Sequence, residues 1–320
     1  MVMARLLIAF TSAAAIGAAA ADYPTRPIRI VVTYAPGGST DVVARLLSQP
    51  LGEALGQQVV VDNRGGAGGI IGTDIVAHAA ADGYTLLFGT SAGLMINPLI
   101  QKKLPYDVAR DFAAVSLLVI NPQILVAYPG LPVKTVGELV KLAKAKPGQI
   151  NYASPGVGSP NHMGMELLKA MAGIDLVHVP YKGGAPAVTD LIAGQVQLLF
   201  NSMPSVLPLV KNGRLKALAV GGATRSPAAP DIPTVAESGV PGFEYVTWYG
   251  LFAPSKTPRA IVTRLNEAVV GSLRKPEIDR QLRVQGSEPH PTTPEEVAKF
   301  MRVERERWER VVKTVGLQVQ

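Results

Sequence analysis

Cysteine is absent from this 320-residue chain. The protein therefore has no disulfide bond, no thiolate nucleophile or thiolate metal site, and no iron–sulfur cluster. It also cannot be anchored to a membrane as a lipoprotein through an N-terminal cysteine. Its stability must come from its hydrophobic cores, and the chain is long enough to build two domains of ordinary size.

Histidine is scarce too, with four residues in the chain. His78, His178 and His290 are widely spaced, and the sequence contains no H-E-x-x-H motif or tight His/Asp cluster. We therefore expect no metal site. The glycine turn at 36–39 matches neither the P-loop nor the dinucleotide-binding pattern, and we expect no cofactor.

The formal net charge is +7, but the basic residues do not gather with aromatic ones. Near the C-terminus arginine and glutamate are interleaved: Arg302, Glu304, Arg305, Glu306, Arg307, Glu309 and Arg310. Such a pattern is typical of a solvated, ion-paired helix face. We therefore expect no nucleic-acid partner.

The N-terminus has the order of a secretory signal peptide. One positive charge lies within residues 1–5, an apolar run begins at 6–10, and small residues fill 11–21. Ala19-x-Ala21 or Ala18-x-Ala20 offers a cleavage site. The alternative is a membrane anchor, but the run is short for about 30 Å of hydrocarbon. We expect residues 1–21 to be removed on export to the periplasm.

The remaining chain alternates β-type runs with helical patterns, which indicates an α/β fold. We expect strands at 28–33, 58–62, 85–89, 123–128, 151–154, 176–179, 197–201, 216–220 and 248–253. Several are bare apolar runs, as in parallel strands covered on both faces. Helix N-caps are expected at Thr135, Ser159, Thr257 and Thr293, the last three directly followed by proline.

Two lobes joined by a double crossing are the architecture that this order favours. The first βα run ends near 120–122, and a Pro/Gly-rich stretch at 222–242 closes the second run. The remainder is too small for a third domain, so we expect it to return to the first lobe. The predicted boundaries are 22–123 with 246–320 for lobe 1, and 124–245 for lobe 2.

Each predicted lobe opens with a strand, a glycine turn and a helix start. Glycines let the backbone approach a ligand, and a helix start presents unpaired N–H groups with partial positive charge. Together they form an anion site without Lys or Arg. The candidate ligand-binding residues of the first unit are Tyr34, Ala35, Gly37, Gly38, Ser39, Thr40 and Asp41. Those of the second unit are Ser154, Gly156, Gly158, Ser159 and His162.

Further candidates follow other predicted strands: Gly68, Thr90, Ser91, Tyr181 and Lys182. In open parallel sheets these positions fall at the carboxyl ends of strands, where ligands bind. One glycine turn alone is a weak indication, because glycine punctuates loops everywhere. The occurrence of one such unit in each predicted lobe is stronger. Lys182 has two interpretations, contact with a carboxylate or exposure to solvent.

Two residues of these units have competing interpretations. The charge of Asp41 would repel a carboxylate, so we expect it to hold the loop through backbone N–H groups rather than to contact an amino group of the ligand. His162 could act as a general base, but a lone histidine there more often lines or braces a pocket. Ser159 and His162 have no acidic neighbour in sequence, and the G-x-S-x-G motif is missing.

Nearly the whole mature chain resembles the receptors of tripartite tricarboxylate transporters, also called the Bug family. The resemblance lies in Tyr23-Pro24-x-Arg26-Pro27-Ile28, Pro36-Gly37-Gly38-x-x-Asp41, Asn63-Arg64-x-Gly66-Ala67-Gly68-Gly69, Asp82-Gly83-Tyr84-Thr85-Leu86, Ser154-x-Gly156-x-Gly158-Ser159-x-x-His162, Val179-Pro180-Tyr181-Lys182-Gly183, Pro233-Thr234-Val235-Ala236-Glu237-x-Gly239 and Trp248-Tyr249-Gly250-Leu251-Phe252-Ala253-Pro254. It implies a type II periplasmic-binding fold with mostly parallel sheets. It also implies a carboxylate gripped by the facing loops of both lobes, partly through water. Ligands of the family include di- and tricarboxylates, acidic amino acids, and nicotinate-like and aromatic acids.

The sequence thus predicts a monomeric solute-binding protein that delivers a small organic acid to membrane transporter subunits. Two alternatives remain open. One is a ligand sensor for a signalling partner, and the other, less favoured, is an exported hydrolase that uses Ser159 and His162. The sequence does not identify the ligand.

Overall fold

Three parallel strands form the centre of each half of the protein. The computed structural model describes residues 23–316, so the predicted signal peptide lies outside the described residues. The first half is built on β1 (Ile28–Val32), β2 (Val59–Asn63) and β3 (Thr85–Thr90). The second half is built on β5 (Asn151–Ser154), β6 (Val177–Pro180) and β7 (Leu198–Ser202). The predicted α/β fold is confirmed.

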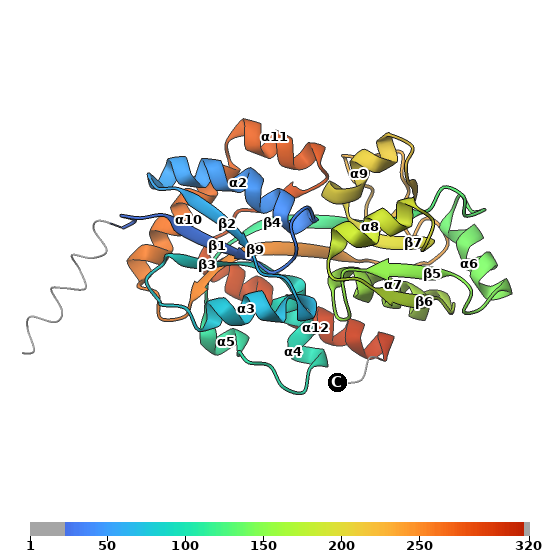
Figure 1. The fold of residues 1–320 in the computed structure, drawn as a ribbon, viewed down its shortest axis with the longest axis horizontal. Helices are drawn as coiled ribbons and strands as arrows, with labels where there is room; N and C mark the ends of the chain where they lie inside the picture. Colours follow the sequence, from blue (N-terminus) through green and yellow to red (C-terminus); the bar gives the residue numbers. More distant parts are fainter. Residues whose placement is uncertain (1–22, 317–320) are drawn as a thin grey trace, which may run out of the picture.

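One long strand, β4 (Phe112–Ala127), passes from the first half into the second (Figure 1). It pairs antiparallel with β9 (Val246–Pro254) in the first half and with β7 and β8 (Lys216–Val220) in the second. The strand order is β2-β1-β3-β9-β4-β7-β5-β6. The expected parallel pairing therefore holds within each set of three strands. The joined sheet as a whole is mixed, because every pairing through β4 or β9 is antiparallel.

The predicted start of a strand at residue 123 is wrong, because β4 already begins at Phe112 and passes through 120–122 without a break. Pro122 lies inside the strand, opposite Val246. Proline removes only one N–H, and its fixed φ fits extended backbone. It stands where β4 changes partners, since residues before it pair with β9 and residues after it pair with β7 and β8.

Helices cover both faces of these sheets. The first half carries η1 (Ala67–Gly69), η2 (Ala92–Ile96), α2 (Ser39–Leu55), α3 (Ile70–Ala77), α4 (Asn97–Ile100) and α5 (Val108–Asp111). The second half carries α6 (Val136–Ala145), α7 (Pro160–Ala172), α8 (Gly184–Ile192) and α9 (Met203–Lys211). After β9 follow α10 (Arg259–Leu273), α11 (Pro276–Val284), β10 (Glu288–Pro289) and α12 (Pro294–Val315). No helix within 23–316 is long and apolar enough to span a membrane.

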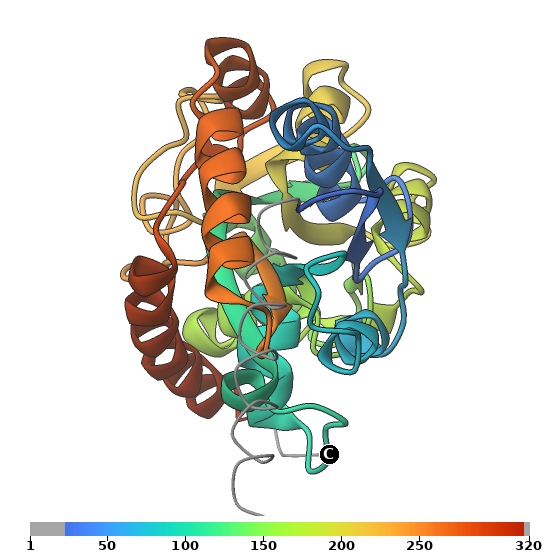
Figure 2. The same ribbon diagram turned by 90° about the vertical axis from the view of Figure 1, so that its left-hand side faces the viewer.

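The first-half sheet separates two hydrophobic cores. Alternation along β1 directs Ile30 and Val32 into the core under α2 and α10, whereas Val31 joins the core with α3 and α12. Figure 2 shows α2 and α3 on opposite sides of this sheet. The second core continues into the second half, because α12 packs on β4 and also contacts α7. The lobe boundaries at 123/124 and 245/246 stay a prediction.

Three of the four predicted N-caps are confirmed. The side chains of Thr135, Ser159 and Thr293 each accept a hydrogen bond from the backbone N–H three residues on. The cap at Thr257 is wrong by one residue. Pro258 is the N-cap of α10, because its extended backbone (ψ 138°) lets its carbonyl accept from Ile261 N at 2.9 Å.

Candidate functional site

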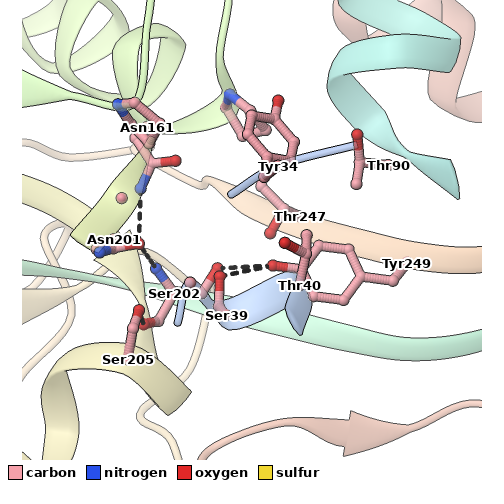
Figure 3. Close-up of a pocket in the computed structure, with 14 residues that line it drawn as sticks. Tyr34, Ser39, Thr40, Thr90, Asn161, Asn201, Ser202, Ser205, Thr247 and Tyr249 are labelled. Carbon is pink, nitrogen blue, oxygen red and sulfur yellow. Dashed lines mark hydrogen bonds between the residues drawn. The ribbon is translucent and has the colours of Figure 1, made fainter. Parts of the chain in front are cut away.

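Four helices begin around one cavity between the halves. These are α2 from the first half and α7, α8 and α9 from the second, and each contributes its cap or first-turn residues to the lining. The lining residues are Tyr34, Gly38, Ser39, Thr40, Thr90, Pro155, Pro160, Asn161, Gly184, Asn201, Ser202, Ser205, Thr247 and Tyr249 (Figure 3). Because the first N–H groups of a helix have no partner within it, four partial positive charges face this space.

The cavity lining contains no Asp, Glu, Lys, Arg or His. Hydroxyl and carboxamide groups supply its polar side chains. Ser39 Oγ lies 2.9 Å from Tyr249 Oη, which in turn lies 3.3 Å from Ser202 Oγ (Figure 3). Burial raises the pKa of Tyr249, so its hydroxyl keeps its hydrogen at neutral pH. The site can therefore bind an anion through neutral donors and helix N-termini.

In this conformation the cavity is small, with a volume of about 30 Å³. That leaves room for one or two water molecules, whereas sites for small organic ligands measure roughly 300–1,000 Å³. An organic acid can enter only if the halves separate or the walls rearrange.

Loops from the two halves touch directly beside the cavity. A Cβ atom built on Gly68 would lie 2.9 Å from the Val157 carbonyl oxygen of the second half. One built on Gly183 would lie 3.1 Å from Ala35 Cβ of the first half. Real Cβ atoms are rarely this close to a neighbour, so glycine at these positions permits the close approach of the two loops. The two halves are therefore closed on each other.

Asp41 holds the first glycine loop. Its carboxylate accepts the Gly37 N–H at 2.9 Å and ion-pairs with Arg45 at 3.0 Å. Burial opposes ionisation, but the hydrogen bonds from Arg45 and Gly37 outweigh it and lower the pKa of Asp41. Asp41 does not line the cavity, and these contacts fit the loop-holding interpretation.

The second glycine loop is held by the hydroxyl groups of two serines. Ser154, which is fully buried, accepts the Gly156 N–H at 3.1 Å. Ser159 donates to the Gly156 carbonyl at 2.6 Å and accepts the His162 N–H at 3.3 Å. These hydrogen bonds fix the loop that carries Pro155 into the cavity.

His162 is part of a buried aromatic stack. Its ring lies 4.1 Å from that of His178, which stacks at 4.9 Å on Tyr152. Desolvation lowers the pKa of each histidine to about 4. His178 looked isolated in the sequence, but the pairing of β5 with β6 places it opposite Tyr152.

The Ser159 and His162 side chains are not arranged as nucleophile and base. His162 Nδ1 accepts the Gly158 N–H at 3.2 Å, and Ser159 Oγ contacts the backbone N–H of His162 rather than its ring. His178 Nε2 lies 2.6 Å from Ser154 Oγ, but that serine has no exposed surface. These contacts do not favour the hydrolase interpretation.

The structure distributes the predicted site residues over three places. Tyr34, Gly38, Ser39, Thr40 and Thr90 line the cavity. A larger adjoining groove of about 640 Å³ is lined by Tyr34 again, with Ala35, Gly68, Gly156, Tyr181 and Lys182. The remaining candidates line neither: Gly37, Asp41, Ser91, Ser154, Gly158, Ser159 and His162.

Sequence reasoning missed six polar lining residues: Asn161, Asn201, Ser202, Ser205, Thr247 and Tyr249. Asn161 Nδ2 donates to Asn201 Oδ1 at 2.8 Å and to the Phe200 carbonyl at 2.7 Å, which ties α7 to β7. Asn201 and Ser202 lie at the carboxyl end of β7. They could have been predicted in the same way as Thr90, which was chosen because ligands bind at the carboxyl ends of parallel strands. Thr247 and Tyr249 lie inside β9 with no turn nearby.

Within residues 23–316, no cluster of three or more His, Asp or Glu side chains is arranged to hold a metal ion.

The sequence matches known proteins along its whole length. The family model described as tripartite tricarboxylate transporter family receptor matches residues 43–317. Protein BugT of Bordetella pertussis is 40% identical over 322 residues, which cover 99% of each protein. The R. palustris protein Rpa4515, solved with adipate, superimposes with a TM-score of 0.90 at 39% identity, covering 92% of this chain and 99% of the other. MatC from Rhodopseudomonas palustris, solved with bound malate, superimposes with a TM-score of 0.86 at 35% identity, covering 91% of this chain and 100% of the other.

Proposed function

The chain belongs to the tripartite tricarboxylate transporter receptor family, and we propose that it captures a small carboxylate between its two halves and delivers it to a membrane transporter. Two relatives of the same fold support the ligand class, because one was solved with adipate and the other with malate. The family is one of solute-binding receptors.

One observation carries the proposal: four helix N-termini meet at a cavity whose lining has no charged side chain. Unpaired N–H groups and hydroxyl donors stabilise a carboxylate, whereas a cation would face the positive ends of four dipoles. We propose Gly38, Ser39 and Thr40 as the contacts from the first half. We propose the backbone N–H of Asn161, in the first turn of α7, as the contact from the second half.

The movement that admits the ligand follows from the connections. We propose that the lobes 22–123 with 246–320 and 124–245 rotate about the middle of β4, which pairs in both halves, and the start of β9, where the chain returns to the first half. An open form would separate the loops that touch at Gly68 and Gly183. The ligand favours closure by its preference for the closed form, and the transporter recognises that form. We further propose export to the periplasm by the signal peptide 1–21, a monomeric state and no turnover of the ligand.

Isothermal titration calorimetry tests the proposal directly. The panel consists of adipate, malate, citrate, glutamate and benzoate, with adipamide as the uncharged control. We expect at least one acid to bind, and at a hundredfold excess over its Kd it should stabilise the fold by about 2.7 kcal/mol. Chromatography of the mixture should recover the acid unchanged. If no acid of the panel gives either binding heat or a thermal shift, the proposal is overturned. If chromatography shows a product, the hydrolase interpretation is favoured.

A further inference from the structure

Gln123 lies behind the cavity wall and contacts two of its hydroxyl groups. It is fully buried on β4, at the point where the strand passes from one sheet to the other. Its Nε2 donates to Ser202 Oγ at 2.7 Å and to Thr247 Oγ1 at 2.8 Å. Ser202 and Thr247 line the cavity, but Gln123 does not.

The backbone fixes which end of the Gln123 amide faces these hydroxyls. The Asn121 carbonyl oxygen lies 3.4 Å from Gln123 Nε2 and accepts the Thr247 hydroxyl at 3.3 Å. A carbonyl oxygen can only accept, so it faces the N–H₂ side of the amide, whose two hydrogens go to the nearer Ser202 and Thr247 hydroxyls, and it takes the single hydrogen of Thr247. Thr247 and Ser202 are therefore the acceptors in their contacts with Gln123.

The donor-to-acceptor direction set by Gln123 is passed on from one hydroxyl group to the next as far as the cavity. Ser202 accepts from Gln123, so its one hydrogen is available to Tyr249 Oη at 3.3 Å. Tyr249 then directs its own hydrogen to Ser39 Oγ at 2.9 Å. Ser39, which already accepts, is left with its hydrogen for a group inside the cavity.

We propose that Gln123 is a positioning residue that turns the Ser39 hydroxyl into a hydrogen-bond donor toward the carboxylate of the ligand. This inference rests on the proposed function and adds a cause for its selectivity. A carboxylate offers only acceptors and fits a donor held in this direction, whereas the N–H₂ of an amide meets a second donor. Without Gln123, the hydroxyl chain has no fixed direction.

A double-mutant cycle tests the relay. The variants are Gln123→Met, which keeps the length of the side chain, Tyr249→Phe, which interrupts the relay, and their combination. The probe is whichever acid of the panel the wild type binds most tightly by calorimetry. We expect Gln123→Met to weaken its binding about tenfold in the wild type, a factor equal to about 1.4 kcal/mol, but less than threefold in the Tyr249→Phe background.

Ser116→Ala is the matched control, because it removes another buried hydrogen bond on β4, 2.9 Å to the Thr292 carbonyl, that touches neither Asn121 nor Gln123. It should change affinity less than twofold. If Gln123→Met does not fold, Ser202→Ala takes its place in the cycle, since it interrupts the relay one residue later. An equal loss in both backgrounds, or no loss, would overturn the inference while leaving the receptor intact. Failure of the wild type to bind any acid would remove the proposed function and this inference with it.

Discussion

His162 and His178 stack with ring centroids 4.1 Å apart, and their rings contact Gly158 and Ser154 of the loop that carries Pro155 into the cavity. Glu166 and Lys169 on α7 form a 2.8 Å ion pair near this stack, and Tyr152 bonds Glu166. Burial lowers the pKa of both histidines to about 4, against 6.5 for free imidazole. The two rings are therefore neutral in the folded protein at pH 7.

Stability should consequently fall between pH 6.5 and 4. In that window the histidines of the unfolded chain are protonated, whereas the buried rings stay neutral, so protonation favours unfolding. The contribution of the two histidines to the free energy of unfolding is therefore complete only above about pH 6.5. Each histidine contributes a slope of up to about 1.4 kcal/mol per pH unit. Urea denaturation at pH 7 and pH 5 should show a smaller difference for His178→Gln than for the wild type. Exposed His290→Gln is the control and should match the wild type.

Gly68→Ala should block closure. Gly68 has φ +62°, and an added Cβ would lie 2.9 Å from the Val157 carbonyl of the other half. We expect ligand affinity to fall at least tenfold, because closing then requires the loops to move apart. Gly173→Ala is a matched control, since its φ of +60° imposes the same strain of about 1–2 kcal/mol with no atom within 4 Å. Equal affinities in the two variants would show that this contact does not limit closure.

Asp41 should matter as a brace of the first loop. Asp41→Ala leaves the Gly37 N–H without its partner and should cost about 1 kcal/mol of stability, with about fivefold weaker ligand binding. Asp41→Asn keeps an acceptor for Gly37 and weakens only the ion pair with half-exposed Arg45, so a smaller loss is expected. Calorimetry and urea denaturation of both variants provide the measurement. Stronger binding by Asp41→Ala would mean that its charge repels the ligand more than its contacts help.

Glu304 should be important for the packing of α12. It is buried, with 4% of its surface exposed, and accepts the indole N–H groups of Trp248 on β9 and Trp308 on its own helix, at 2.8 and 3.2 Å. Glu304→Ala leaves both donors buried without a partner, so we expect a loss of about 2–4 kcal/mol in urea denaturation. Glu309→Gln, which breaks an exposed pair with Arg305, should cost less than about 0.5 kcal/mol. A Glu304→Ala cost as small as that of the control would contradict this role.

Much of the fold could be predicted from the sequence because its strands are short apolar runs bounded by turns. β5 and β8 have the expected ends, and most others differ by one or two residues. The first eleven residues of β4 were missed, because Pro122 suggested a boundary. The length of β4 depends on tertiary contacts, because the strand continues through Pro122 only where β9 before it and β7 after it provide pairing partners.

The site was predictable only where local sequence encodes it. The glycine turns before α2 and α7 carry their own signals, and from the first of them Ser39, which lines the cavity, was predicted. Thr247 and Tyr249 reach the cavity because β9 pairs with β4 just before β4 passes into the second sheet, and this pairing depends on residues far away in the sequence. The neighbour of His162 is likewise set by strand pairing, so spacing alone could not reveal His178.

The most direct test of the account is a crystal structure of the protein with the tightest-binding acid of the panel. The account predicts one carboxylate between the first turns of α2 and α7, within hydrogen-bonding distance of the Ser39 hydroxyl, with the halves closed around it. An acid bound outside this cavity, or held there by a lysine or arginine side chain, would contradict the claim that backbone N–H groups and hydroxyls form the anion site.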